Sequence, residues 1–446
     1  MSEIRIAFIG AGSYGFTFKL VADILSYPAL KDCGFSFMDV DRTRLDNLKV
    51  ILDRYFQMAG YKKQAVYTMN MEEALTGADF VINLVKIGFL EASVQDMDAA
   101  KKYGLYQTIG DTCGLAGVFR GLRTMAFDIK LCAAIEKFSS PKAVVINYTN
   151  PQSMLVMAAS KTSRIPFIGL CHSVQGTTQM IAQYMNIPYS ELRYEAAGIN
   201  HMNWVTKLEH HGKDIYPEFR RLAKERGIFY GGYLKGNEND VLAGLGATRL
   251  DMLNRIGFMV TESSTHFPEY VPYYLRTPEL RDQYKLVIDM FKTNIERKEK
   301  KYMDFVNQAR KGELAIPERS NEYGSMIINS MVTNSLCMIY ANVMNTGLVT
   351  NLPEFSSVEV ACLVDGNGVQ PCHYGALPTQ LAMLCQMDIS VHQLAVEAIL
   401  KKDRQYVYWA LMADPLTHSI LNLDQIKEVA DDLIGKQKEY LADYLG

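Results

Sequence analysis

The sequence lacks a long hydrophobic run, and it has no excess of charge of either sign. No apolar stretch approaches the roughly 20 residues of a membrane-spanning helix. The N-terminal apolar stretch, about six residues long, is too short for a signal-peptide core. Lys and Arg number 46 against 49 Asp and Glu, a formal net charge of −3, whereas nucleic acid or an anionic membrane surface would favour a basic face. We therefore expect a cytoplasmic protein that binds neither nucleic acid nor membrane.

Closely spaced cysteine pairs are also absent. No two of the eight cysteines form a C-x-x-C motif, and they lie at Cys33, Cys113, Cys132, Cys171, Cys337, Cys362, Cys372 and Cys385. This pattern indicates neither a disulfide framework nor a structural zinc site, and it agrees with a reducing compartment. The length of 446 residues, 48% of them hydrophobic, is sufficient for two domains.

Strands and helices alternate in the first part of the chain. Short apolar runs predict buried strands at Ile4–Ile9, Phe35–Asp39, Phe80–Val85, Ala143–Asn147 and Phe167–Cys171. Amphipathic segments between them predict helices at Phe16–Ser26, Arg42–Ala59 and Arg120–Lys137. This alternation is typical of an α/β fold with a doubly wound parallel sheet of the Rossmann type. We assign this domain to residues 1–195.

The pattern changes near residue 190. Tyr194–Ile199 and Met202–Leu208 alternate like antiparallel strands, with a hairpin turn at Glu209–Asp214. Long helices are expected at Pro278–Lys300, Ser325–Tyr340, Leu377–Leu400 and Leu423–Tyr440. Residues 227–240, rich in Gly, Tyr and Asn, are predicted to form a mobile loop. We expect a second, α+β domain over residues 196–446, joined to the first without a flexible linker.

The first predicted strand leads into a G-x-G-x-x-G motif that opens a helix. Gly10 allows the tight turn, and Gly12 and Ser13 bring backbone N–H groups close to a pyrophosphate before Gly15. Asp39 lies 24 residues after Gly15, at the end of the second strand. A carboxylate there binds ribose hydroxyls and repels a 2′-phosphate, which favours NAD over NADP. The alternative is an ordinary glycine turn with a surface aspartate. We also expect two strand-end asparagines to contact the cofactor, namely Asn83 and Asn147.

Four segments dense in chemical groups follow or adjoin predicted strands. They are Ile109–Gly114, Asn147–Pro151, Gly169–Ser173 and Gly198–Trp204. Because the carboxyl ends of the strands in such a sheet form one crevice, these segments should line the edge where a nicotinamide ring arrives. Cys171 and His201 could bind one transition-metal ion there. Taken alone, a buried thiol and a core histidine are the commoner interpretation.

Seven motifs together resemble glycoside hydrolase family 4. They are GAGSYGF, FMDVDRTRL, NYTNP, GLCHSVQGT, GINHMNW, TESSTHFPEYVPYY and VEVACLVDGNGVQP. The resemblance extends from Ile4 to about Leu433. Within the family, GLCHSVQGT, HFPEYVPYY and GVQPCHYGALP are most similar to the bacterial melibiase-type α-galactosidases. The resemblance implies a fold related to that of lactate and malate dehydrogenases.

The resemblance also implies an enzyme, a glycosidase that depends on NAD and on a divalent metal, usually Mn²⁺. The implied reaction is retaining hydrolysis of α-glycosides, most of all α-galactosides such as melibiose. It proceeds by C3 oxidation, C2 deprotonation, elimination, water addition and re-reduction. The alternatives are an α-glucosidase or an α-glucuronidase or α-galacturonidase of the same family, an NAD-dependent hydroxy-acid or sugar dehydrogenase, or a non-enzymatic NAD-sensing module. Family members commonly form homodimers or homotetramers, which we expect here.

The resemblance assigns the metal ligands and the base. Cys171 and His201 fall on the metal ligands of the family. Tyr270, the first tyrosine of YVPYY, matches the base that removes the C2 proton, and we favour it over Tyr273 and Tyr274. Since an unperturbed tyrosine has a pKa of about 10, this role needs positive charge nearby.

The remaining roles concern the leaving group and the sugar. Asp111 is a candidate general acid, with a turn or helix-cap role as the alternative. His172 replaces the Asp or Asn of phospho-sugar members, which argues against a 6-phosphorylated substrate, and it could contact a hydroxyl or act as the acid. Asn150, Glu262 and His266 are predicted to bind sugar hydroxyls, with ordinary polar loop residues as the alternative for Glu262 and His266. A uronide carboxylate would need a cation nearby, and the candidates are Lys19, Arg120, Arg123 and Arg276.

Overall fold

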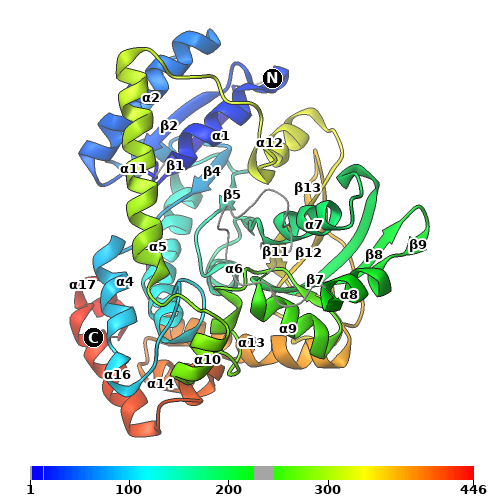
Figure 1. Cartoon of the computed structure of the whole chain (residues 1–446). Coiled ribbons are helices and arrows are strands. Elements are labelled where there is room, and N and C mark those ends of the chain that lie inside the picture. Colours follow the sequence, from blue (N-terminus) through cyan, green and yellow to red (C-terminus); the bar gives the residue numbers. More distant parts are fainter. Residues whose placement is uncertain (1–2, 14, 226–245, 446) are drawn as a thin grey trace.

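One mixed sheet runs through the molecule in the computed structural model, which describes residues 3–13, 15–225 and 246–445 (Figure 1). The loop predicted at residues 227–240 lies outside these residues. The strand order is β10-β8-β7-β12-β11-β6-β5-β4-β1-β2-β3, with β13 beside β12 and β9 beside β8. The described residues include no helix that is both long and apolar enough to cross a bilayer.

The first part of the sheet is parallel, as the sequence predicted. Its strands are β1 (Arg5–Ile9), β2 (Gly34–Met38), β3 (Val66–Thr68), β4 (Phe80–Asn83), β5 (Val144–Asn147) and β6 (Phe167–Gly169). Their order, 3-2-1-4-5-6, is that of a doubly wound dinucleotide-binding sheet. The fold class is therefore confirmed. Residues of β1 alternate between two apolar cores: Ile6 and Phe8 face one, and Ala7 and Ile9 face the other.

Helices cover both faces of these strands, because every central strand is apolar on both sides. They are α1 (Phe16–Leu25), α2 (Arg42–Ala59), α3 (Met71–Leu75), α4 (Phe89–Asp98), α5 (Gly114–Phe138), α6 (Gln152–Thr162) and α7 (Ser173–Tyr184). The boundaries of α2 follow from its caps: the Asp41 side chain accepts from the N–H of Arg44, and Gly60 ends the helix in the left-handed conformation. The helix predicted at Arg120–Lys137 begins earlier, at Gly114.

The second part of the sheet is antiparallel. Its strands are β7 (Leu192–Ile199), β8 (Met202–His210), β9 (Lys213–Asp214), β10 (Met259–Val260), β11 (Cys337–Met344), β12 (Ser357–Asp365) and β13 (Gly368–Pro371). The predicted hairpin forms, with Glu209 paired to Asp214 and His210 to Lys213. Asn342 of β11 pairs with Gly169 of β6, so the sheet is continuous between the two parts. The division at residue 195 stays a prediction.

The later helices surround the antiparallel strands and return to the first part of the chain. They are α8 (Tyr216–Glu225), α9 (Ala247–Ile256), α10 (Pro278–Gln283), α11 (Met290–Lys311), α12 (Tyr323–Thr333), α13 (Thr379–Lys401), α14 (Gln405–Ala413), α15 (Pro415–His418), α16 (Leu423–Lys436) and α17 (Lys438–Leu445). Helix α11 packs along α2 (Figure 1). The chain therefore crosses from its second half back onto the nucleotide-binding half.

Three of the predicted helices need correction. The helix expected at Pro278–Lys300 is two helices, because Asp289 takes a left-handed conformation before α11. The helix expected at Ser325–Tyr340 is wrong beyond Thr333, where left-handed Asn334 ends α12 and the chain continues into β11. The segment expected at Leu423–Tyr440 is divided between α16 and α17.

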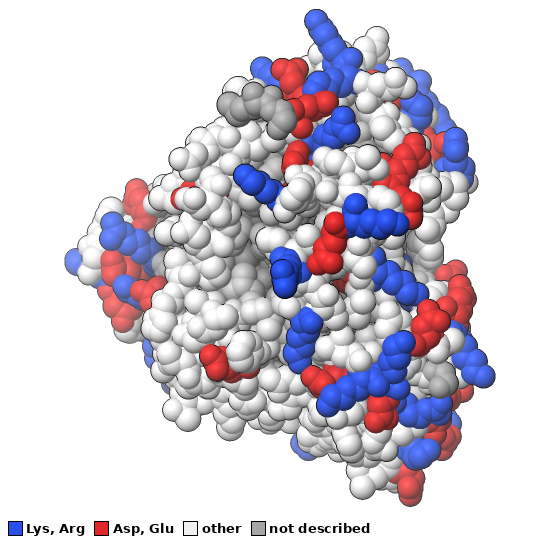
Figure 2. All heavy atoms as spheres, turned by 180° about the vertical axis from the view of Figure 1, so that it is seen from behind, with Lys and Arg blue, Asp and Glu red and all other residues white. Residues whose placement is uncertain are grey.

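On the face shown in Figure 2, acidic and basic side chains are interspersed, and a broad hollowed area carries few charges.

Candidate active site

The glycine turn after β1 closes tightly against its neighbours. Gly10 has a φ of 77°, and a Cβ there would lie 2.9 Å from backbone atoms of Leu84 and Val85. A Cβ on Gly12 would lie 2.8 Å from Oδ2 of Asp39, because the Gly12 N–H donates to that oxygen at 2.7 Å. The turn thus requires glycine and holds the Asp39 carboxylate beside it.

A cleft of about 670 Å³ begins at this turn. Residues of the parallel strands, of α5 and of α11 line it, among them Gly10, Gly12, Ser13, Asp39, Arg44, Lys86, Asp111, Arg120, Tyr148, Asn150, Phe291 and Lys298. The cleft has the position and the glycine turn that a dinucleotide needs. Gly15 lies at the N-cap of α1. Asn83 and Asn147 lie fully buried and hydrogen-bonded to each other at 2.9 Å, so they do not line the cleft.

Two cations in this cleft lie near Asp111. Arg120 Nη1 is 3.9 Å from Asp111 Oδ2, and its Nε donates to the backbone oxygen of Asn150. Burial and the neighbouring Arg120 lower the pKa of Lys86 to about 7. Lys86 is not among the residues predicted from the sequence, although its place shortly after β4, at the carboxyl end of the sheet, is a signal for a site residue. Arg123 is instead paired with Asp96 in the interior.

Cys171 and His201 come together as predicted, and Glu262 joins them. One ligand atom from each of the three lies within 4.8 Å of the others. His201 Nε2 is 3.4 Å from Glu262 Oε2, while its Nδ1 is 2.9 Å from the hydroxyl of Tyr270. A thiolate, an imidazole and a carboxylate form a donor set suited to a first-row transition metal such as Mn²⁺. These residues therefore fit the metal that the family resemblance implies.

The charged groups of this set shift one another's pKa values toward the ionised forms. Burial opposes ionisation, yet Glu262 and Cys171 raise the pKa of His201 to about 9. Against the same burial, His201 lowers the pKa of the Cys171 thiol. His201 and His266 lower the pKa of Glu262 to about 2. The cation of His201 lies between two anionic groups, and this opposite charge favours their ionised forms in the interior.

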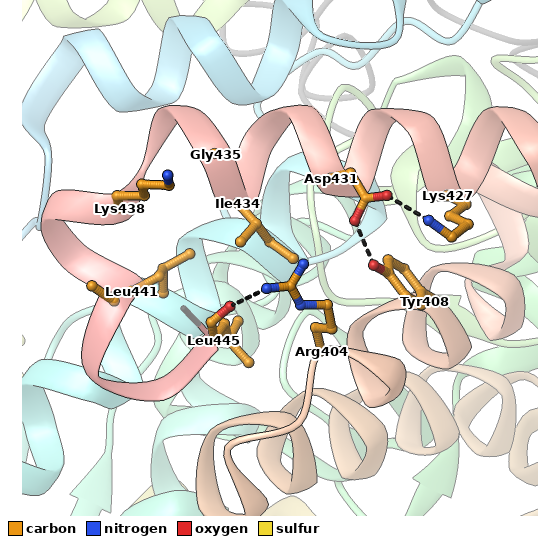
Figure 3. A pocket seen from close by; sticks show the side chains of 10 residues that line it. Arg404, Tyr408, Lys427, Asp431, Ile434, Gly435, Lys438, Leu441 and Leu445 are labelled. Carbon is orange, nitrogen blue, oxygen red and sulfur yellow. Dashed lines mark hydrogen bonds and ion pairs between the residues drawn. The ribbon is translucent and has the colours of Figure 1, made fainter.

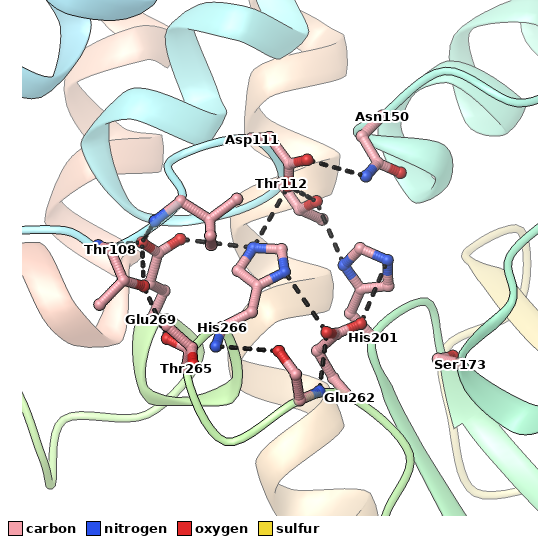
Figure 4. Close-up of polar contacts among 12 residues, drawn as sticks. Thr108, Asp111, Thr112, Asn150, Ser173, His201, Glu262, Thr265, His266 and Glu269 are labelled. Atoms are coloured by element: carbon pink, nitrogen blue, oxygen red, sulfur yellow. Dashed lines mark hydrogen bonds and ion pairs between the residues drawn. The ribbon is translucent and has the colours of Figure 1, made fainter. Parts of the chain in front are cut away.

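A second group of ionisable side chains lies beside the first (Figure 4). His266 Nε2 is 3.2 Å from Asp111 Oδ1 and 3.4 Å from Glu269 Oε2. Burial opposes charge on both partners, but Asp111 and the two glutamates raise the pKa of His266 well above its usual value. His266 and Arg120 hold the pKa of Asp111 well below its usual range. The proton of the Asp111–His266 pair therefore resides on His266.

The other predicted site residues differ in their surroundings. Asn150 Nδ2 donates to Asp111 Oδ2 at 3.2 Å. Tyr270 is fully buried beside His201, whereas Tyr273 is 43% exposed and the Tyr274 hydroxyl donates to Asp251. This geometry favours Tyr270 over Tyr273 and Tyr274 as the predicted base.

His172 lies at a more open position. Its side chain is 57% exposed, with Nε2 2.6 Å from Glu322 Oε2. The other oxygen of Glu322 accepts from Lys19 at 2.7 Å, so Lys19 is engaged there. The ring of His172 stacks against Tyr148, which lines the cleft. His172 therefore adjoins the cleft through its contact with Tyr148.

A separate hollow of about 540 Å³ lies between α14, α16 and α17 (Figure 3). Its polar groups already satisfy one another: Tyr408 and Lys427 both contact Asp431, and Arg404 donates to the backbone oxygen of Leu445. We assign no activity to this hollow.

Comparison with known proteins identifies relatives along the whole chain. A model described as family 4 glycosyl hydrolase matches residues 5–187, and one described as the family 4 glycosyl hydrolase C-terminal domain matches residues 196–417. The chain is 36% identical to an α-galactosidase of Bacillus subtilis, covering 99% of both chains. It is 31% identical to an α-galactosidase of Rhizobium meliloti, covering 100% of this chain and 90% of the relative. It is also 28% identical to an α-galacturonidase of Lachnoclostridium phytofermentans, covering 99% and 97%.

Solved structures share the fold. A putative glucosidase from Bacillus subtilis superposes with a TM-score of 0.85 at 27% identity, covering 97% of this chain and 99% of that one. A 6-phospho-α-glucosidase from gut microorganisms, solved in complex with NAD and Mn²⁺, superposes with a TM-score of 0.82 at 19% identity, covering 99% of both chains.

Proposed function

Because the chain belongs to glycosyl hydrolase family 4, we propose that it hydrolyses α-galactosides with NAD and Mn²⁺ as cofactors and with retention at C1. One observation carries this proposal: full-length similarity to two α-galactosidases coincides with a Cys171–His201–Glu262 set beside a dinucleotide cleft. Membership of a hydrolase family argues against the alternative of a hydroxy-acid dehydrogenase.

Two groups of residues are proposed to hold the cofactors. The glycine turn and Asp39 would bind NAD, and Cys171 and His201, with Glu262, would bind the metal. When bound, NAD supplies reversible hydride transfer and the metal acts as a Lewis acid. Glu262, which the sequence analysis assigned to the sugar, thus has a second candidate role.

Tyr270 is the proposed base for the C2 proton. Its hydroxyl is 2.9 Å from His201 Nδ1, which places it next to the metal-binding set. Burial and Cys113 raise its pKa well above the usual value. Accepting a proton at neutral pH therefore requires positive charge at its hydroxyl, and the adjoining metal-binding set is where such a charge would lie.

The Asp111–His266 pair is the proposed source of the proton for the leaving oxygen, with His266 carrying it. Two coupled groups of this kind act as one titrating unit, so the role belongs to the pair. Asn150, bonded to Asp111, is proposed to contact sugar hydroxyls. His172 remains the alternative acid or a hydroxyl contact.

A second substrate class has specific support. Lys86 and Arg120 are cations of the cleft close to Asp111, and paired cations suit a carboxylate. The similarity to an α-galacturonidase agrees with this, so an α-galacturonide is the runner-up, ahead of an α-glucoside.

A panel of nitrophenyl α-galactoside, α-glucoside, α-galacturonide and α-glucuronide tests the proposal, with Mn²⁺, NAD⁺ and a reductant present. We expect nitrophenol release from the galactoside without accumulation of NADH. Activity on a uronide alone would overturn the substrate assignment, and steady NADH formation with a hydroxy acid would overturn the hydrolase assignment. The same preparation, measured by light scattering, tests the predicted homodimer or homotetramer.

A further inference from the structure

Glu269 is a fully buried carboxylate that binds a run of backbone amides (Figure 4). Its Oε1 accepts from the N–H groups of Thr108 at 2.6 Å, Ile109 at 2.7 Å and Gly110 at 3.1 Å. The Thr108 hydroxyl oxygen lies 3.0 Å from the same oxygen, and the Gly110 N–H also lies 3.0 Å from Oε2. One side chain therefore satisfies three consecutive amides from a segment about 160 residues away in sequence.

These amides belong to the turn that immediately precedes Asp111. Gly110 has a φ of 64°, and a Cβ there would lie 2.2 Å from Met97 Sδ, so the turn is tightly constrained. Consecutive N–H groups that converge on one point form an anion-binding nest. Without the carboxylate these amides would be left without a hydrogen-bond partner inside the protein, which is unfavourable.

The same carboxylate also faces the partner of Asp111. Glu269 Oε2 is 3.4 Å from His266 Nε2, and that nitrogen is 3.2 Å from Asp111 Oδ1. The Thr108 hydroxyl additionally donates to the backbone oxygen of Thr265, next to His266. Glu269 thus contacts both the backbone that carries Asp111 and the imidazole that is ion-paired with it.

We propose that Glu269 is a positioning residue that fixes the geometry of the Asp111–His266 pair for proton delivery to the leaving group. This inference rests on the proposed function. The backbone turn and His266 occupy both oxygens of Glu269, so it acts through the pair and not on the sugar.

The test compares two α-galactosides in Glu269→Gln: a nitrophenyl galactoside, whose leaving group needs no proton, and methyl α-galactoside, whose leaving group does. Glutamine keeps one oxygen for the amides but turns a donor toward His266. We expect the ratio of kcat/KM for nitrophenyl to methyl galactoside to rise about tenfold over wild type, within the range that a general acid contributes. Asp111→Asn should raise the same ratio. Glu269→Ala, which removes every contact, should raise it further and lower the melting temperature.

Asp251→Asn is the matched control, since Asp251 is a buried carboxylate that accepts from the hydroxyls of Tyr274 and Tyr284 and not from the turn. It should leave the ratio at the wild-type value even if stability falls. An unchanged ratio in Glu269→Gln, or one unchanged in Asp111→Asn, would overturn the inference while the α-galactosidase proposal stands. A wild-type enzyme that cleaves neither galactoside would overturn both.

Discussion

The nucleotide cleft and the neighbouring catalytic clusters depend on different chemical groups. The cleft depends on backbone amides and on positions where only glycine fits, such as Gly10 and Gly12. The clusters depend on buried ionisable side chains whose pKa values are set by one another, as with Cys171, His201 and Glu262. The shape of the backbone therefore determines binding in the cleft, and the charges of the side chains determine binding in the clusters. Substitutions in one region should change its own ligand binding and leave that of the other region intact.

The largest effect should come from removing the thiolate. We expect Cys171→Ser to lower kcat/KM about a thousandfold, because loss of a metal ligand forfeits several kcal/mol of transition-state stabilisation. Mn²⁺ binding, measured by electron paramagnetic resonance, should weaken in parallel, and NAD binding measured by calorimetry should persist. Cys372→Ser is the control thiol and should retain both. Loss of NAD binding in Cys171→Ser would contradict the separation of the two regions.

A pH effect should follow in the metal-free protein. The pKa of His201 is raised from 6.5 to about 9, so its contribution to stability is complete below pH 6.5 and is lost as pH rises through 9. The loss is up to about 3 kcal/mol. Glu262 acts in the opposite sense: its pKa falls from 4.5 to about 2, so its contribution is lost as pH falls from 4.5 toward 2.

Melting temperatures measured across this range in the presence of a chelator would detect both changes. His201→Gln should flatten the alkaline side of the profile and leave NAD affinity unchanged. An alkaline decline that persists in that variant would show that another group is responsible.

A smaller effect is expected from filling the glycine turn. A Cβ at Gly12 would meet Asp39 Oδ2 at 2.8 Å, so Gly12→Ala should displace Asp39 and weaken NAD binding about tenfold, with Mn²⁺ affinity unchanged. Gly435→Ala is a suitable control because no heavy atom lies within 4 Å of the added carbon. Calorimetric titration with NAD distinguishes the two variants, and equal affinities would contradict the role of the turn.

The smallest effect should come from His172→Gln. Because His172 is largely exposed and paired with Glu322, we expect a loss in kcat/KM of about threefold to tenfold, below that of a principal general acid. Steady-state kinetics of His172→Gln and Asp111→Asn, measured under the same conditions, compare the two losses in kcat/KM. A larger loss in His172→Gln would move the role of the acid from the buried pair to this open position.

The contrast between local sequence patterns and contacts made by the tertiary fold also explains how much of the structure could be predicted from the sequence. Strands such as Phe80–Asn83 are buried on both faces and appear as continuous apolar runs, so the parallel sheet and its glycine turn were predictable. The first part of the strand Cys337–Met344, up to Tyr340, was assigned to a helix because its apolar run follows α12 closely, and the left-handed turn at Asn334 has no strong sequence signal.

Among site residues, Cys171 and His201 were predictable from strand ends and from motif resemblance. Glu269 was missed because the amides that it binds lie far away in sequence, and only the tertiary fold brings Thr108 to Gly110 against it. Lys86 was missed because an isolated lysine after a strand is normally solvated. The lowered pKa of Lys86 arises from burial, which depends on tertiary packing.

The return of α11 onto α2 has a practical consequence for dissecting the chain. Phe291 and Lys298, both on α11, form part of the wall of the cleft whose floor comes from the first residues of the protein. A fragment that ends near residue 195 would lack that wall and would leave β6 as an exposed edge strand, a template for aggregation. Swapping the nucleotide-binding half between relatives should therefore succeed only when the α11 segment is transplanted with it.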